Sequence, residues 1–196
     1  MLKKICILGD IGSGKSFIAK QFGYPVFNAD REVNRIYRNN IFCYKILKNK
    51  LPKYIKSYPI NKTELTKAIL ANKSNIGKIA RVVHPIVRKG MRSFLRKHRK
   101  KTTVILDVPL LIENNLNEKK DILIFVDAKK TQINSYLKKR KNYNKKIIDN
   151  LRKLQKKPSY KKKLSTYIIK NDFKLLTIKK RVKFIKKIIE NERNNT

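Results

Sequence analysis

The chain has 196 residues, and 51 Lys and Arg stand against 13 Asp and Glu, which gives a formal net charge of +38. This length suffices for one α/β core with an insertion. The two cysteines form neither a metal-binding spacing nor a disulfide framework, and no apolar run approaches membrane-spanning length. These features argue against a disulfide-stapled secreted domain and a membrane protein, so we expect a cytoplasmic protein.

The positive charge is spread over nearly every segment and is accompanied by many Asn and Ile residues. A basic face or tail would indicate a nucleic acid or an anionic membrane as partner. The even spread instead favours a compositional bias, as expected from an A/T-rich genome. We therefore expect no specific nucleic acid and no membrane as partner. A field of this sign also steers polyanions such as ATP toward the protein.

The first predicted elements are a short buried strand over residues 5–8 and a helix over residues 16–22. Between them lies a stretch with the spacing of a phosphate-binding loop, Gly9-Asp10-Ile11-Gly12-Ser13-Gly14-Lys15-Ser16. Glycines allow the close backbone approach that lets N–H groups surround a phosphate, and the helix N-terminus adds its dipole. We predict that Lys15 reaches the terminal phosphates, that Ser16 binds Mg²⁺ and that nucleotide contacts extend to Phe17. The alternative is a plain Gly/Ser turn.

Asp10 is unusual in this loop, because a carboxylate repels anions unless its side chain points away. Loops of Rab-like small GTPases also carry Asp at this position, which indicates that the side chain faces outward. A GTPase should also have an Asn-Lys-x-Asp box and an Asp-x-x-Gly switch. Neither is found, and residues 61–64 are the nearest approach to the first.

A second short strand is predicted over residues 24–30, where it ends in a polar cluster. The carboxyl ends of parallel strands line the crevice of an open α/β sheet, so Asp30 should face the phosphate loop. A carboxylate there can orient an acceptor hydroxyl and accept its proton during phosphoryl transfer. The alternative is that Asp30 is the N-cap of the following helix.

Residues 31–99 have apolar side chains at three- and four-residue intervals between charged ones, which predicts several helices. This stretch is too long for one crossover, so we predict a helical insertion of the kind that carries the acceptor site in phosphoryl-transfer enzymes. Pro85 should begin a new helix, which places His84 near its N-cap. There the ring can bind a ligand, or it can have a purely structural role.

The third predicted strand is the apolar run over residues 103–107, which ends in Asp107. A carboxylate at the end of a buried parallel strand meets the Mg²⁺ region, although it can also serve only as a cap of the strand. Residues 108–113 predict a turn and the start of an apolar helix. A fourth strand is predicted over residues 121–127.

A helix is predicted from Thr131, and the sequence from there to residue 163 is dense in charge. Beside a phosphate site such a segment can be a mobile lid, whose closure delivers Arg140 to the transferring phosphoryl group. A plain charged surface helix is the alternative. A fifth strand over residues 167–169 precedes Asn171, and a basic amphipathic helix from residue 174 to about residue 192 covers the sheet.

These motifs resemble the dephospho-coenzyme A kinase family over nearly the whole chain. Besides the phosphate loop and Arg140, the resemblance is carried by Phe27-Asn28-Ala29-Asp30, Val83-His84-Pro85, Asp107-Val108-Pro109-Leu110-Leu111-Ile112-Glu113 and Ile168-Ile169-Lys170-Asn171. The phosphate loop is generic. The stretch that begins at Asp107 and the His-Pro pair are much more specific to the family.

The resemblance implies transfer of the ATP γ-phosphoryl group to the ribose 3′-hydroxyl of dephospho-coenzyme A, the last step of coenzyme A synthesis, with Mg²⁺. It implies an α/β P-loop NTPase three-layer sandwich with a parallel five-stranded sheet. The core would comprise residues 1–29, 101–128 and 164–196, the helical acceptor-binding insertion residues 30–100, and the helical lid residues 129–163. We expect a monomer or a weak homo-oligomer.

The resemblance also implies roles for individual residues. Asp30 is the candidate base, Lys15 and Arg140 stabilise the transferring group, His84 and Asp107 place the acceptor, and Asn171 lies near adenine.

Three positions depart from the family pattern: Asp10 replaces a usual Gly, Asn28 a usual Asp, and Tyr136 a frequent Arg. Surplus lysines can supply charge near Tyr136 but not a bidentate contact. Two alternatives stay open. They are a P-loop kinase of a nucleoside or another small alcohol, and a basic nucleic-acid-binding protein.

Overall fold

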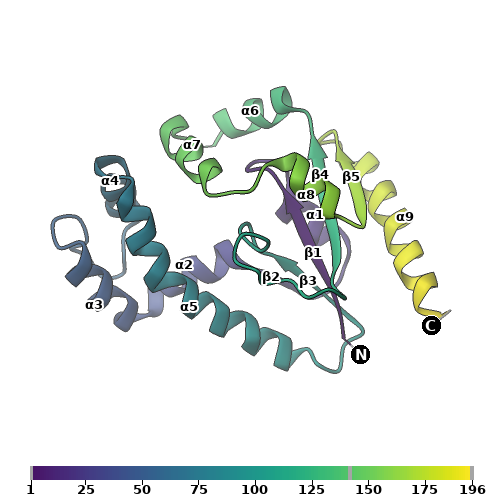
Figure 1. Ribbon diagram of the computed structural model, residues 1–196, viewed down its shortest axis with the longest axis horizontal. Helices are drawn as coiled ribbons and strands as arrows, with labels where there is room; N and C mark the ends of the chain where they lie inside the picture. Colours follow the sequence, from purple (N-terminus) through teal and green to yellow (C-terminus); the bar gives the residue numbers. More distant parts are fainter. Residues whose placement is uncertain (1, 141–142, 195–196) are drawn as a thin grey trace. The chain divides into compact units, whose positions relative to one another are not determined.

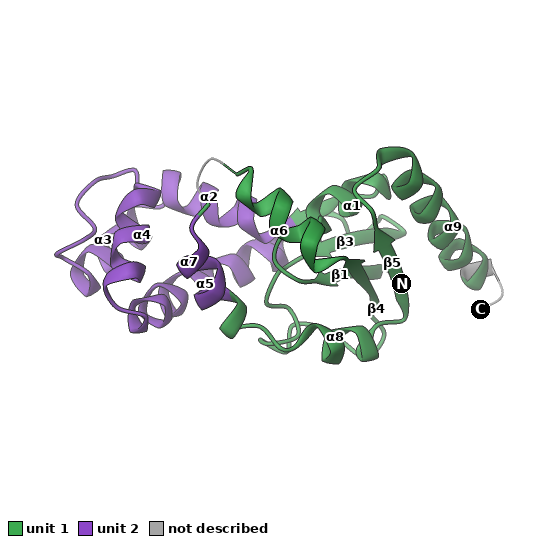
Figure 2. Ribbon diagram, turned by 90° about the horizontal axis from the view of Figure 1, so that it is seen from above, with its two compact units in different colours: residues 1–27, 98–143, 152–196 green, residues 28–97, 144–151 purple. Residues whose placement is uncertain are grey.

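A computed structural model describes residues 2–140 and 143–194, and the chain divides into two compact units. Figure 2 colours them separately. Unit 1 comprises residues 1–27, 98–143 and 152–196, and unit 2 comprises residues 28–97 and 144–151.

Unit 1 is built on a five-stranded sheet with the strand order β2-β3-β1-β4-β5, which can be followed in Figure 1. The strands are β1 (Lys3–Gly9), β2 (Val26–Asn28), β3 (Thr103–Asp107), β4 (Ile122–Ala128) and β5 (Tyr167–Asn171). β1 pairs in parallel with β3 and β4, and β4 pairs in parallel with β5. The register sets Gly9 beside Val126, so the chain leaves β1 at the carboxyl edge of the sheet.

Helices cover both faces of this sheet, which explains why its central strands are continuous apolar runs. On one face α1 (Lys15–Gln21) and α9 (Leu175–Asn194) pack on the strands. α8 (Pro158–Leu164) contacts β1 and β4 and lies on the other side of the sheet in Figure 2. α9 meets the core with one apolar stripe at helical spacing: Ile178, Val182, Ile185 and Ile189. The predicted three-layer α/β fold with a parallel five-stranded sheet is confirmed.

Unit 2 is helical. It contains α2 (Ala29–Asn39), α3 (Ile41–Lys50), α4 (Lys62–Ala71) and α5 (Ser74–Lys97). The other three helices each contact α5. The buried apolar side chains of α5 recur every three or four residues, as an amphipathic helix requires: Ile79, Val82, Val83, Val87 and Met91.

Two further helices follow β4, namely α6 (Lys130–Lys138) and α7 (Lys145–Lys153). Most of α7 belongs to unit 2, and its last residues belong to unit 1. Among the described helices, none combines the length and the apolar character needed to cross a lipid bilayer.

The prediction that Pro85 begins a new helix is wrong, because Pro85 lies inside α5 and His84 is therefore not near an N-cap. A proline within a helix removes one backbone donor and costs about 3 kcal/mol. The apolar stripe of α5 continues on both sides of Pro85, and its packing outweighs this cost.

The apolar helix predicted to start within residues 108–113 is also absent from the described structure, which has consecutive turns there. The Leu111 N–H donates to the Val108 carbonyl, so Pro109 occupies the second position of a turn that favours its fixed φ. The turns end at Asn115, whose φ of 50° is left-handed. Asn tolerates this conformation better than most residues.

Candidate active site

The phosphate loop follows β1 directly and precedes α1, as predicted. Gly12 and Gly14 have φ values of 85° and 88°, which side chains rarely adopt. A Cβ at Gly12 would lie 2.7 Å from the Leu137 side chain, and one at Gly14 would collide with the Asn171 amide. Both positions therefore need glycine for their conformation and for space.

Lys15 is buried, and its ammonium group lies over the loop. Nζ donates to the Asp10 carbonyl at 2.7 Å and to the Gly9 carbonyl at 3.2 Å. Gly14 is the N-cap of α1 and offers no side-chain cap. The first turn of α1 thus presents backbone N–H groups and a fixed positive charge at one place, which is the requirement of an anion site.

Asn171 connects the last strand to the phosphate loop. Its Nδ2 donates to the Ser13 carbonyl at 2.7 Å, and its Oδ1 accepts from the Phe173 N–H at 2.8 Å. Phe173 has a φ of 61° and stacks on Tyr136, with ring centroids 4.1 Å apart and planes inclined by 15°. Phe173 was not among the site residues predicted from the sequence. The stretch Asn171-Asp172-Phe173, which follows an apolar strand, could have been used to predict a turn there.

The residues expected at the metal and the acceptor lie in both units. Asp107 is buried at the end of β3, and Ser16 is exposed in the first turn of α1. Asp30 is exposed in the first turn of α2. The alternative that Asp30 is the N-cap is wrong, because Asn28 holds that position and accepts from the Arg31 N–H at 2.8 Å.

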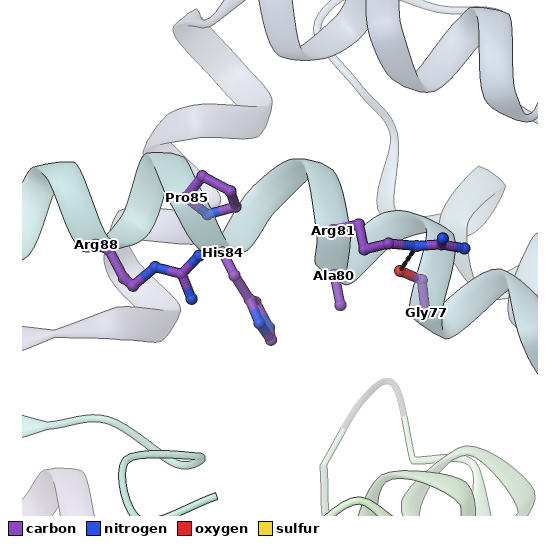
Figure 3. A pocket seen from close by; sticks show the side chains of 6 residues that line it. All are labelled: Gly77, Ala80, Arg81, His84, Pro85 and Arg88. Carbon is purple, nitrogen blue, oxygen red and sulfur yellow. Dashed lines mark hydrogen bonds between the residues drawn. The ribbon is translucent and has the colours of Figure 1, made fainter. Parts of the chain in front are cut away.

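His84 lines a hollow of about 510 Å³ on one side of α5. Figure 3 shows the His84 ring and the Arg88 guanidinium projecting from the same side of the helix. Burial lowers the pKa of His84, and the positive charge of Arg88 lowers it further. The other lining residues are Gly77, Ala80, Arg81 and Pro85. This side of α5 therefore carries two arginines and an imidazole that is readily kept neutral.

Arg140 is exposed two residues after α6, where its backbone N–H donates to the Leu137 carbonyl at 3.1 Å. The expected lid range, residues 129–163, includes residues 141–142, which lie outside the described residues. A second arginine reaches the phosphate loop from α7. This arginine is Arg152, and its Nε lies 3.5 Å from Oδ1 of Asp10. The sequence offered no signal for this pair.

A buried ion pair connects the family-specific stretch that starts at Asp107 to α8. The Lys161 ammonium lies 3.0 Å from the Glu113 carboxylate and 3.2 Å from the Gln155 amide oxygen. Glu113 also accepts from the Lys156 N–H at 2.8 Å. These contacts hold the start of α8 on the turns that follow β3.

In a sheet of this order, a glycine-rich loop joins a parallel strand to a helix, and a buried lysine lies over the loop. This arrangement defines the class of P-loop nucleotide-binding α/β proteins. The comparisons with known proteins agree with this class. The family model described as "Dephospho-CoA kinase" matches residues 4–177. The chain belongs to the dephospho-CoA kinase family, as the resemblance predicted.

A dephospho-CoA kinase of Wolbachia pipientis wMel is 31% identical over 170 residues, which cover 84% of this chain and 87% of that protein. A crystal structure of TT1252 from Thermus thermophilus covers 96% of this chain and 97% of its own, with a TM-score of 0.76 and 23% identity. The structure of a dephospho-CoA kinase from Campylobacter jejuni covers both chains completely, with a TM-score of 0.65 and 18% identity. The two structures show the shared fold.

Proposed function

We propose that this chain transfers the γ-phosphoryl group of ATP to the ribose 3′-hydroxyl of dephospho-coenzyme A, which gives coenzyme A and ADP. The observation that carries this proposal is the complete phosphate loop with Lys15 over it, in a chain that matches the family model over most of its length. Nothing in the relatives favours a basic nucleic-acid-binding protein.

The nucleotide binds the phosphate loop through the backbone of residues 9–17. Lys15 exchanges its contacts with the two loop carbonyls for the terminal phosphates, because a phosphate oxygen is the stronger acceptor for an ammonium group. Arg140 places a positive charge beside the transferring phosphoryl group and stabilises its negative charge. We place adenine beside Asn171, whose two hydrogen bonds hold the loops on either side of it.

Mg²⁺ fits the oxygen donors of unit 1. Ser16 is accessible in the first turn of α1, and Asp107 is a carboxylate at the end of the neighbouring strand. Within the described residues no group of three or more His, Cys, Asp or Glu could hold a metal ion. Mg²⁺ does not require one, since it keeps several waters and uses few protein ligands beside phosphates. We propose that Ser16 holds the ion, which neutralises phosphate charge.

The acceptor binds unit 2. His84, Arg81 and Arg88 lie within two helical turns on one side of α5, where they can receive the anionic part of dephospho-coenzyme A. Asp30 orients the 3′-hydroxyl and accepts its proton, while Asp107 helps to place the acceptor.

We further propose that the protein works in the cytoplasm as a monomer or a weak homo-oligomer. Both cysteines are free and buried.

The test is ADP release from Mg-ATP with dephospho-coenzyme A, compared with adenosine, AMP, pantetheine and shikimate as acceptors. Lys15→Ala is the blank. Turnover confined to dephospho-coenzyme A supports the proposal. Turnover with adenosine or shikimate alone would instead identify a different P-loop kinase.

A further inference from the structure

The ion pair between Asp10 and Arg152 lies on the phosphate loop itself. Arg152 Nε is 3.5 Å from Asp10 Oδ1, and the side chains are only 25% and 21% exposed. The same Oδ1 accepts from the Ile11 N–H at 2.6 Å, so the carboxylate has a defined orientation within the loop. Partial burial reduces the screening that makes most surface ion pairs weak.

Asp10 binds two cationic side chains through different atoms. Lys15 Nζ contacts its backbone carbonyl at 2.7 Å, and Arg152 approaches its carboxylate. An uncompensated carboxylate in this loop would repel a triphosphate. Arg152 cancels that repulsion, so that Asp10 does not oppose the binding of an anion.

A guanidinium can contact a carboxylate and a phosphate together, because its donors form a planar fork. Arg152 stands near the end of α7, in the part of that helix that belongs to unit 1 with the phosphate loop. Asp10 therefore holds a second arginine at the phosphate loop itself.

We propose that Arg152 contacts the phosphates of bound ATP and that Asp10 is the positioning residue that keeps it there. This inference rests on the proposed function only in taking ATP as the ligand. Arg152 then stabilises a part of the negative charge of the phosphates that Lys15 and Arg140 do not stabilise.

The test measures Mg-ATP affinity by calorimetry, and steady-state kinetics with both substrates, for wild type, Arg152→Met and Arg152→Lys. We expect Arg152→Met to lower kcat/KM for ATP by about 10²- to 10³-fold, with the KM for dephospho-coenzyme A unchanged. Arg152→Lys restores only a minor part, because an ammonium group lacks the fork. The matched control is Arg35→Met, which breaks an Arg–Glu pair on α2 and leaves ATP kinetics as in wild type.

Asp10→Asn keeps an acceptor for the Ile11 N–H but removes the charge that holds Arg152. It should weaken ATP binding in the wild-type background and have no further effect in Arg152→Met, because the two residues act as one unit. Wild-type ATP affinity and turnover in Arg152→Met, with a lowered Tm, would overturn the proposal and leave a structural ion pair. If the wild type fails to phosphorylate dephospho-coenzyme A but Arg152→Met still loses ATP affinity, the proposed acceptor is wrong and Arg152 keeps its role.

Discussion

The Lys161 ammonium lies 3.0 Å from the Glu113 carboxylate, and the Lys161 side chain is only 2% exposed. Glu113 is the last residue of the Asp-Val-Pro-Leu-Leu-Ile-Glu stretch, so the pair gives that residue a physical role. It joins the turns after β3 to α8, which packs on β1 and β4. A buried charge that loses its partner is strongly destabilising.

Lys161→Met should therefore lower the free energy of unfolding by about 3–5 kcal/mol, measured by denaturant titration. The double variant Lys161→Met, Glu113→Gln removes both charges and keeps an acceptor for the Lys156 N–H. It should recover most of the loss. A double variant no more stable than the single one would show that the pair is not the cause.

Gly12→Ala should destabilise the protein by at least about 1–2 kcal/mol, because the position has a left-handed φ and faces Leu137. ATP binding should weaken with it. The control is Gly77→Ala on α5, where a Cβ meets no described atom within 4 Å. This change should stabilise the helix by about 0.5–1 kcal/mol, so a loss of stability there would contradict the packing described for α5.

His84 should make stability depend on pH. Its pKa is lowered in the folded protein by burial and by Arg88, so the unfolded chain binds its proton first as the pH falls. The stabilisation is complete above the unfolded pKa of about 6.5 and is lost as the pH falls through the folded pKa.

The free energy of unfolding should therefore fall more steeply from about pH 7.5 to about pH 5.5 in wild type than in His84→Gln. Equal slopes in wild type and His84→Gln would show that His84 is not the titrating group.

Asp30→Asn should lower the rate of phosphoryl transfer by about 10²- to 10⁴-fold while both substrates still bind, since it removes a proton acceptor and keeps the shape. Single-turnover kinetics separate this step from product release. Glu190→Gln, an exposed acid on α9, is the control. An unchanged single-turnover rate in Asp30→Asn would remove Asp30 from the chemistry.

Local sequence patterns were sufficient to predict much of this fold. β3 has the predicted bounds, Thr103–Asp107, because a short continuous apolar run between charged residues is typical of a buried strand. The phosphate loop depends on spacing within eight residues, so it was visible directly. The roles of Asp30 and His84 stay predictions.

Features that depend on contacts between residues far apart in the sequence could not be predicted from local patterns. Pro85 is a local signal for a helix start, yet the packing of α5 against three helices overrides it. Asp10 and Arg152 lie far apart in the sequence, and a single arginine among many basic residues gives no sign of its partner. The same holds for Glu113 and Lys161.

The most direct measurement is ³¹P NMR of the product formed from Mg-ATP and dephospho-coenzyme A by wild type and by Lys15→Ala. We predict one new phosphomonoester resonance, coupled to the ribose H3′ proton, with wild type and none with Lys15→Ala. Release of inorganic phosphate alone, or a monoester at another hydroxyl, would contradict the assignment of the 3′-hydroxyl of dephospho-coenzyme A as the acceptor.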